Sequence, residues 1–329
     1  MTGQKVKDAD LAAALLAGDR RSLARAITLV ESTRLADREK AESLLAEVLP
    51  QTGRAVRLGI SGAPGAGKST FIEAFGTYLT GAGHKVAVLA IDPSSRRSGG
   101  TILGDKTRME KLARDPDAFI RPSPAGTTLG GVARRTREAM LLAEAARFDV
   151  VLVETVGVGQ SETAVSEMVD LFVLLVSPGG GDDLQGIKRG VMELADLLLV
   201  TKADADLVPA ANRAAADYKG ALHLIRPKYS GIFAEVMQVS ALTEKGIAEC
   251  WQTTQNLHGA LENSGQLASL RADQSRRWFW NEVQAVLSEE IMANEELGKA
   301  AKKLENAVIA GKTLPYTAAR SLFRRIIAA

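Results

Sequence analysis

Residues 55–70 constrain the fold more than any other part of the chain. The mostly apolar run 55–61 is typical of a buried parallel strand, and Gly-Ala-Pro-Gly-Ala-Gly-Lys-Ser follows it directly over 62–69. This sequence matches the pattern G-x-x-x-x-G-K-[ST], in which glycines let the backbone wrap closely around phosphate groups. The helix that follows directs its positive end at the same phosphates. We therefore expect a nucleoside triphosphate site at this turn.

Each part of the loop has an expected role. Lys68 would reach the β- and γ-phosphates and take part in catalysis, and the Ser69 hydroxyl would bind Mg²⁺. The other expected nucleotide contacts come from Gly62, Ala63, Pro64, Gly65, Ala66, Gly67 and Thr70.

From residue 55 onward, short apolar runs alternate with helical patterns. Strands are predicted at 55–61, 86–91, 149–153, 170–176, 196–200 and 235–239, and helices at 68–81, 104–114, 131–147, 183–194, 207–219 and 244–261. This alternation indicates an α/β fold of the P-loop NTPase type, a mostly parallel sheet covered by helices on both faces. Ligands of such sheets bind beyond the carboxyl ends of the strands.

Helical patterns flank this core on both sides. We predict a helical N-terminal extension over 1–53, a core over 54–261 and a helical C-terminal extension over 262–329. The last part holds Trp278, Phe279 and Trp280 next to each other, and Pro315 can open a final helix over 315–327. Such aromatic side chains usually pack against helices or oligomer partners, and we expect this extension to form a homodimer.

Acidic residues follow two of the predicted strands. Asp92 ends the strand 86–91, where it can reach a metal ion or its bound waters. Glu154 ends the strand 149–153, and Gly157 follows three residues later, at the spacing at which GTP-hydrolysing proteins place a Mg²⁺-shell acid and a γ-phosphate contact. The longer Glu154 side chain favours a contact through water or the orientation of the attacking water. Asp105 is either a first-turn helix acid or a further Mg²⁺ ligand.

The segment that follows the strand 170–176 is rich in glycine and aspartate. Its Lys188 and Arg189 are candidates for a charge-stabilising contact in the active site or for a dimer contact, and a solvated helix start is the ordinary alternative.

The strand 196–200 is followed by Thr-Lys-Ala-Asp over 201–204. The Asp204 carboxylate can accept hydrogen bonds from the guanine N1–H and amino group, a donor pair that adenine lacks, and the Lys202 stem would lie along the base. After the strand 235–239, the residues Ser240, Ala241 and Leu242 would complete the base pocket. The order of these motifs along the chain favours GTP.

The charge balance, the cysteine count and the length of the apolar runs limit the kinds of partner and compartment that we expect. The 41 basic and 39 acidic residues give a net charge of +2, which argues against a dedicated nucleic-acid binder. The single cysteine, Cys250, suits a reducing compartment and excludes an internal disulfide. No apolar run approaches the roughly 20 residues that a membrane span needs. We expect a cytoplasmic protein without a membrane or nucleic-acid partner.

Four motifs together carry a family resemblance. The segments GAPGAGKST (62–70), DPSSRRSGGTILGDKTRM (92–109), ETVGVGQSE (154–162) and GGGDDLQGIKRG (179–190) make the chain resemble the GTPases of the MeaB, ArgK and methylmalonic aciduria type A family over nearly its whole length. The last three segments are long and are not shared by P-loop proteins at large. Thr201 departs from the family, whose base motif usually begins with Asn. The departure implies that the amide that braces the base loop against the P-loop is lost, with an effect on nucleotide affinity.

The resemblance implies a Mg²⁺-dependent homodimeric GTPase that binds GTP and GDP and chaperones methylmalonyl-CoA mutase, an adenosylcobalamin enzyme. It would gate cofactor delivery and protect the mutase from inactivation. It also implies that Asp92, Asp105 and Glu154 surround Mg²⁺ with Ser69, and that the loops 92–108, 154–165 and 177–190 are switches. We expect slow basal hydrolysis, stimulated when the mutase orders 177–190 and brings Lys188 or Arg189 to the phosphates.

Three other functional classes stay open at this point. A nickel-type metal-delivery GTPase would need clustered soft or imidazole ligands, whereas the chain has three scattered histidines. An ATP-dependent kinase of transport proteins would require adenine binding, which Asp204 opposes. A scaffold that binds nucleotide without hydrolysis is disfavoured by the presence of Lys68, Asp92 and Glu154.

Overall fold

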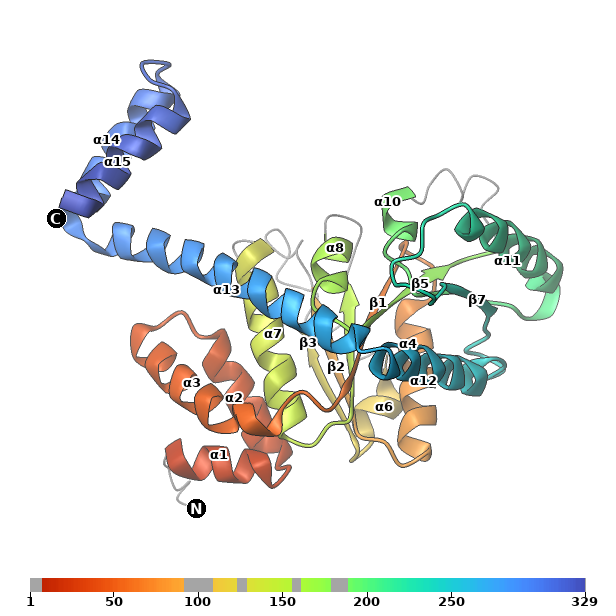
Figure 1. Ribbon diagram of the computed structural model, residues 1–329. Coiled ribbons are helices and arrows are strands. Elements are labelled where there is room, and N and C mark those ends of the chain that lie inside the picture. The colour runs from red at the N-terminus through yellow and green to blue at the C-terminus, as the bar shows by residue number, and fades with distance from the viewer. Residues whose placement is uncertain (1–7, 92–108, 123–128, 156–160, 179–188, 329) are drawn as a thin grey trace. The chain divides into compact units, whose positions relative to one another are not determined.

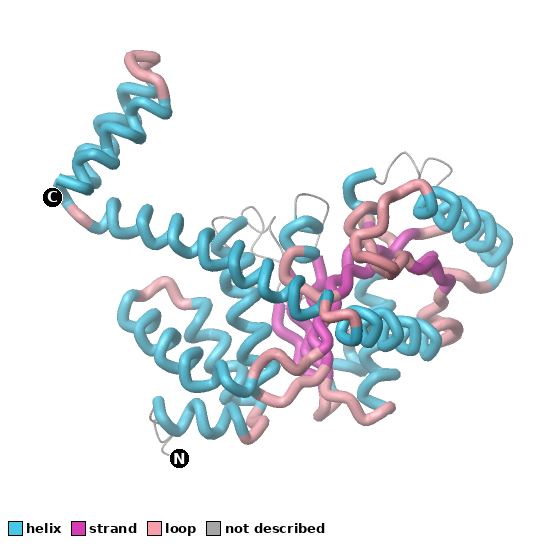
Figure 2. The backbone as a smooth tube through the Cα atoms, in the orientation of Figure 1, coloured by secondary structure: helices cyan, strands magenta, loops and turns pink. Residues whose placement is uncertain are grey.

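A parallel sheet of seven strands organises the larger part of the chain, residues 1–271. Figure 2 draws its strands in magenta. The computed structural model describes residues 8–91, 109–122, 129–155, 161–178 and 189–328. The strand order is β3-β2-β4-β1-β5-β6-β7. The strands are β1 (Val56–Gly62), β2 (Val86–Ile91), β3 (Ala118–Pro122), β4 (Val150–Thr155), β5 (Leu171–Val176), β6 (Leu197–Val200) and β7 (Glu235–Gln238). All adjacent pairs are parallel, so the predicted α/β fold class is confirmed.

Helices cover both faces of this sheet (Figure 1). On one face, α4 (Lys68–Gly81), α6 (Glu110–Arg114) and α12 (Ile247–Asn263) bury Phe75, Leu112 and Trp251 against Ile60 and Leu152. On the other face, α11 (Val208–His223) packs on β6 and β7, while α7 (Leu129–Ala145) and α8 (Ser161–Ser166) pack on β4. The remaining short element of this region is α10 (Arg189–Met192). Because side chains alternate along a strand, each face presents every second residue to its own set of helices.

The N-terminal extension is helical, as predicted. It consists of α1 (Asp8–Leu16), α2 (Arg20–Glu31), α3 (Leu35–Val48) and the 3₁₀ helix η1 (Leu49–Gln51). The helices α2 and α3 pack on α7, and an Arg20 side-chain nitrogen donates to the Asp115 carbonyl at 2.9 Å. An Arg121–Glu31 ion pair also joins the edge strand β3 to α2. This extension therefore belongs to the same compact body as the sheet.

The chain divides into two compact units, Met1–Arg271 and Ala272–Ala329. The division falls within α13 (Gln266–Ala293), and α14 (Glu295–Ile309) follows α13 in the second unit. In the first unit, the 3₁₀ helix η2 (Ala205–Leu207) directly precedes α11. The last helix is α15 (Pro315–Ala328), close to the predicted 315–327, and it packs on α14 within the second unit. No helix in the described part of the chain is long and apolar enough to cross a membrane.

Most elements lie where the sequence predicts them. The helix predicted at 68–81 has those bounds, and each of the six predicted strands exists within two residues at either end. Among the strands and α-helices of the described residues, the prediction omits the edge strand β3 and the six-residue helix α8. β3 pairs with β2 alone and ends in Pro122, so its apolar stretch is too short to be recognised from pattern. Parts of the predicted helices 104–114 and 183–194 lie outside the described residues.

Candidate functional site

The loop between β1 and α4 leaves the carboxyl end of the central strand. A Cβ atom on Gly62 would lie 2.4 Å from the Leu175 carbonyl oxygen of β5, so only glycine fits where the loop begins. Gly67 has a φ of 86° and is the N-cap of α4, a backbone conformation that glycine adopts most readily. The loop therefore delivers the first backbone N–H groups of α4 to the carboxyl edge of the sheet, the arrangement that binds phosphate.

Lys68 lies against the loop that it follows. Its Nζ donates to the carbonyl oxygens of Gly62 at 2.7 Å and of Ala63 at 3.3 Å. Partial burial lowers the pKa of Lys68, while the charges of Glu154 and Glu162 act in the opposite direction. The two hydrogen bonds fix the orientation of the Lys68 side chain, so its ammonium lies within the loop that is predicted to bind phosphates.

The two described residues that are predicted to bind Mg²⁺ lie together between the sheet and α4. The Ser69 Oγ, in the first turn of α4, lies 3.4 Å from Oε1 of the buried Glu154 at the end of β4. This separation is longer than an ordinary O–H···O hydrogen bond of about 2.7–2.8 Å, so the contact itself is weak. A hydroxyl and a carboxylate are the hard oxygen donors that Mg²⁺ prefers alongside phosphate and water. The pair fits a magnesium ion.

The residues predicted to form the guanine pocket lie together at the ends of β6 and β7. The Ser240 hydroxyl donates to the Asp204 carboxylate and so restrains the side chain that is predicted to recognise the base. Lys202 has a φ of 54°, and its Cε would lie 4.0 Å from a Cβ atom on Gly67, so its stem passes beside the phosphate loop. Ala241 is half-buried and Leu242 is 80% exposed next to it. The described residues thus place the base motif next to the P-loop.

Thr201 corrects one expectation. Since Thr replaces the usual Asn, the sequence predicts that the brace between the base loop and the P-loop is lost. The structure shows that the buried Thr201 hydroxyl lies 2.7 Å from the Ala66 carbonyl and 3.0 Å from the Val176 carbonyl. A hydroxyl has one proton, so the shorter contact to Ala66 is its main hydrogen bond. The brace is kept, with a hydroxyl in place of an amide.

Sequence reasoning missed three residues beside the site. Ser61 and Thr155 are buried at the ends of β1 and β4, and Thr155 Oγ1 donates to Ser61 Oγ at 2.8 Å. Glu162, near the start of α8, is buried and its charge acts on Lys68. A single hydroxyl residue within an apolar strand has no sequence signature, so Ser61 and Thr155 could not be predicted. Glu162 is the last residue of the family segment ETVGVGQSE, and this position could have identified it.

Several predicted residues cannot be placed. Asp92, Asp105, Gly157 and Lys188 lie outside the residues that the structure describes, so their roles stay predictions. Across the described ranges, no group of three or more His, Cys, Asp or Glu side chains is arranged to hold a metal ion.

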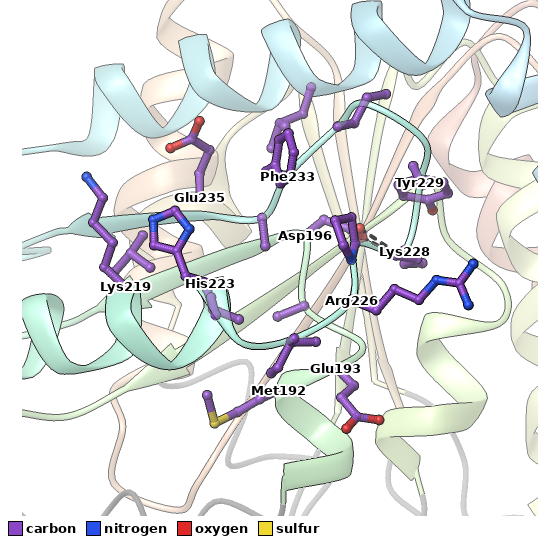
Figure 3. Close-up of a pocket in the computed structure, with 18 of the residues that line it drawn as sticks. Met192, Glu193, Asp196, Lys219, His223, Arg226, Lys228, Tyr229, Phe233 and Glu235 are labelled. Carbon is purple, nitrogen blue, oxygen red and sulfur yellow. Dashed lines mark hydrogen bonds and ion pairs between the residues drawn. The ribbon is translucent and has the colours of Figure 1, made fainter.

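A separate pocket of about 380 Å³ lies beside β6, β7 and the end of α11 (Figure 3). It opens near the amino ends of these strands, the edge opposite to the P-loop. Lys228 Nζ lies 3.0 Å from the Asp196 carboxylate, and burial raises the pKa of Asp196 although Lys228 opposes the shift. The other charged lining residues are the cations Lys219 and Arg226 and the acids Glu193 and Glu235, so the lining charges balance. The pocket is therefore distinct from the candidate nucleotide site.

Comparisons with known proteins agree with this geometry. The family model described as methylmalonyl Co-A mutase-associated GTPase MeaB matches residues 23–296. A putative GTPase of Caulobacter vibrioides is 55% identical over 306 residues, with 93% of each chain covered. The mitochondrial methylmalonic aciduria type A homolog of Mus musculus is 48% identical over 320 residues, which cover 94% of this chain and 77% of the mouse protein.

A solved structure extends the similarity to the fold. The crystal structure of a LAO/AO transport system kinase superposes with a TM-score of 0.77 at 40% identity and covers 99% of both chains. Together with the family model and the P-loop geometry, these similarities show that the chain belongs to the MeaB family of GTPases and is a GTP hydrolase.

Proposed function

We propose that this GTPase requires Mg²⁺ and acts as a chaperone of an adenosylcobalamin-dependent methylmalonyl-CoA mutase. In this role it gates delivery of the cofactor and protects the mutase from inactivation. The description of the matching family, which names the mutase, carries this proposal. The name of the mouse relative, which refers to methylmalonic aciduria, supports it.

The described residues support the proposed binding of GTP and Mg²⁺, which precedes hydrolysis. Asp204, held by Ser240, accepts hydrogen bonds from the guanine edge and so selects GTP over ATP. The backbone N–H groups at the start of α4 and the Lys68 ammonium would bind the β- and γ-phosphates. Ser69 and Glu154 would hold Mg²⁺, with Asp92 and Asp105 as further proposed ligands. When bound, Mg²⁺ neutralises the charge that develops on the phosphate oxygens.

Stimulation by the mutase is the regulatory part of the proposal. We assign Gly157 to the γ-phosphate and Lys188 to the transition-state charge after the segment 177–190 is ordered by the partner. A positioned cation of this kind is worth about 10³–10⁵ in rate in other phosphoryl-transfer enzymes. Lys188→Ala is therefore expected to abolish stimulation by the mutase, and full stimulation of this variant would exclude Lys188 from the role.

The first experiment measures GTP turnover by the purified protein with and without methylmalonyl-CoA mutase, with ATP as the control nucleotide. A slow, GTP-specific and Mg²⁺-dependent rate that rises with the mutase supports the proposal. A rate that the mutase leaves unchanged leaves the GTPase assignment in place and removes this partner. Lys68→Ala is the control for contaminating hydrolases, because it removes the phosphate-binding ammonium.

A second candidate function follows from the solved relative whose name is a transport system kinase. A kinase of this kind would transfer phosphate from ATP to a protein. Equal turnover of ATP and GTP, together with a phosphorylated acceptor protein, would favour this candidate.

A nickel-delivery role predicts instead that Ni²⁺ binds to the protein stoichiometrically. Equilibrium dialysis measures this binding directly.

We also propose that the protein is a cytoplasmic homodimer joined through its C-terminal unit. The cytoplasmic assignment is supported by the single cysteine, Cys250, which is buried and cannot form an internal disulfide. The dimer is supported by apolar side chains that α13 and α15 expose in the second unit. The large ones are Phe279, Trp280, Val286, Leu287, Met292, Tyr316, Phe323 and Ile327.

A further inference from the structure

A pair of buried hydroxyls lies where two strands reach the candidate site. Ser61 directly precedes the first glycine of the P-loop, and Thr155 directly follows Glu154. Both side chains are buried, and Thr155 Oγ1 donates to Ser61 Oγ at 2.8 Å. Neither residue belongs to the motif that binds phosphate or base, so the reaction as derived above leaves this hydrogen bond without a role.

The position of the bond in the sheet is informative. The register of β1 on β4 ends at the pair Ile60 and Glu154, so the hydroxyl bond joins the next residues, one step beyond the last paired positions. β1 turns into the P-loop there, and β4 ends. The side-chain hydrogen bond therefore extends the connection between β1 and β4 to the position where β1 enters the P-loop and β4 carries Glu154.

The two faces of the sheet separate the tether from the ligands. Ser61 neighbours Leu174 of β5, which packs in the cluster beneath α11, whereas Glu154 points to the opposite face, toward α4. A substitution at Thr155 can therefore shift the Glu154 backbone, while the Glu154 carboxylate and the residues of the P-loop keep their own chemistry. An unpartnered hydroxyl in this apolar surrounding is unfavourable, which keeps the two side chains bonded to each other.

We infer that Ser61 and Thr155 are a positioning pair for the Mg²⁺ site. Their hydrogen bond fixes the end of β4 against the start of the P-loop, and this sets the distance between the Glu154 carboxylate and the Ser69 hydroxyl, 3.4 Å in the structure. The inference rests on the proposed Mg²⁺-dependent function. Displacements of about 1 Å at a site of this kind can cost about 10²-fold in rate, so one tether at the strand ends is sufficient to matter.

The test compares two isosteric variants of buried threonines. Thr155→Val removes the tether, and Thr254→Val is the matched control, because the buried Thr254 hydroxyl donates to the Cys250 carbonyl at 2.8 Å within its own helix. Calorimetric titration of Mg²⁺ into the GDP-bound proteins measures the metal affinity, and GTP turnover at varied Mg²⁺ measures its effect. We expect Thr155→Val to weaken Mg²⁺ binding about tenfold, the loss of roughly one hydrogen bond, and Thr155→Ser to restore it.

The outcomes separate the inference from the function on which it rests. If Thr155→Val binds Mg²⁺ as tightly as Thr254→Val while the wild-type protein hydrolyses GTP with Mg²⁺, the inference is wrong and the proposed function stands. If the wild-type protein shows no Mg²⁺-dependent turnover, both fail. Should Thr155→Val not fold, Ser61→Ala removes the same bond from the other strand, and unchanged Mg²⁺ affinity in that variant overturns the inference.

Discussion

Thr201 shows how a single hydroxyl can take over a structural role at the nucleotide site. Its side chain donates to the Ala66 carbonyl, and its own backbone N–H donates to Val176 at 2.8 Å, so the base loop is tied both to the P-loop and to β5. An Asn side chain would extend further from the backbone to make the same contact. The shorter Thr reaches Ala66 because the end of β6 lies next to the P-loop.

This geometry predicts the effect of two substitutions at position 201. Thr201→Val keeps the shape but leaves the Ala66 carbonyl without its donor, and we expect affinity for GDP to fall about tenfold. Thr201→Asn supplies an amide donor and is expected to bind GDP within a few-fold of wild type. Calorimetry measures both, with Thr254→Val as the control for losing a buried hydroxyl. Unchanged GDP affinity in Thr201→Val would show that the brace does not contribute to binding.

At the scale of elements, the buried Asp170 carboxylate connects β1, β5 and α13 at the amino ends of the strands, on the edge of the sheet opposite to the P-loop. Asp170, which precedes β5, accepts from the Arg57 backbone N–H at 2.9 Å and from Arg271 Nε and Nη2 at 2.8 and 2.7 Å. His258 Nε2 lies 3.5 Å from the same carboxylate. Burial alone would raise the pKa of Asp170, but the nearby His258 together with the hydrogen bonds and charge of Arg271 outweighs it and lowers the pKa to about 2.

The lowered pKa predicts a specific dependence of stability on pH. A carboxyl group whose pKa is depressed on folding stabilises the protein above its unfolded value, 3.8, and this contribution disappears as pH falls through about 2. The Asp170→Asn variant lacks this ionisable group. The difference in unfolding free energy between the wild-type protein and the variant should therefore decrease by about 2 kcal/mol between neutral pH and about pH 2. Denaturant unfolding of both proteins across this range measures the change. A difference that does not vary with pH would contradict the assignment.

The elements also show which parts of the structure the sequence can predict. The P-loop, α4 and the base motif follow from local pattern, because their glycines, Lys68 and Asp204 have fixed spacings and follow buried strands. The edge strand β3 is missed because its short apolar run ends in proline. The bonds from Thr155 to Ser61 and from Thr201 to Ala66 depend on strand register and on contacts across 94 and 135 residues, which sequence spacing does not show.

At the scale of the whole molecule, the exposed apolar side chains of the second unit predict self-association. Trp280 is 58% exposed and stacks edge-on with Phe279, their ring centroids 5.4 Å apart. Trp280→Glu in the full chain would place a charge in the proposed interface and is expected to convert a dimer into a monomer. Light scattering coupled to chromatography measures the mass. The solvent-exposed Leu224→Glu, in the first unit, is the control, and a wild-type monomer would reject the dimer.

Arg271 determines where the chain can be cut. It is the last residue of the first unit, and besides Asp170 it donates to the backbone carbonyls of Gly53 and Ala55, the latter at 2.9 Å. A protein truncated after residue 261, where the sequence predicts the core to end, loses this arginine and leaves the buried Asp170 carboxylate without its main cation. We expect that protein to melt well below one truncated after Arg271, because breaking a buried pair from one side costs about 3–5 kcal/mol. Equal melting temperatures for the two truncated proteins would place the end of the folding unit ten residues earlier than the structure does.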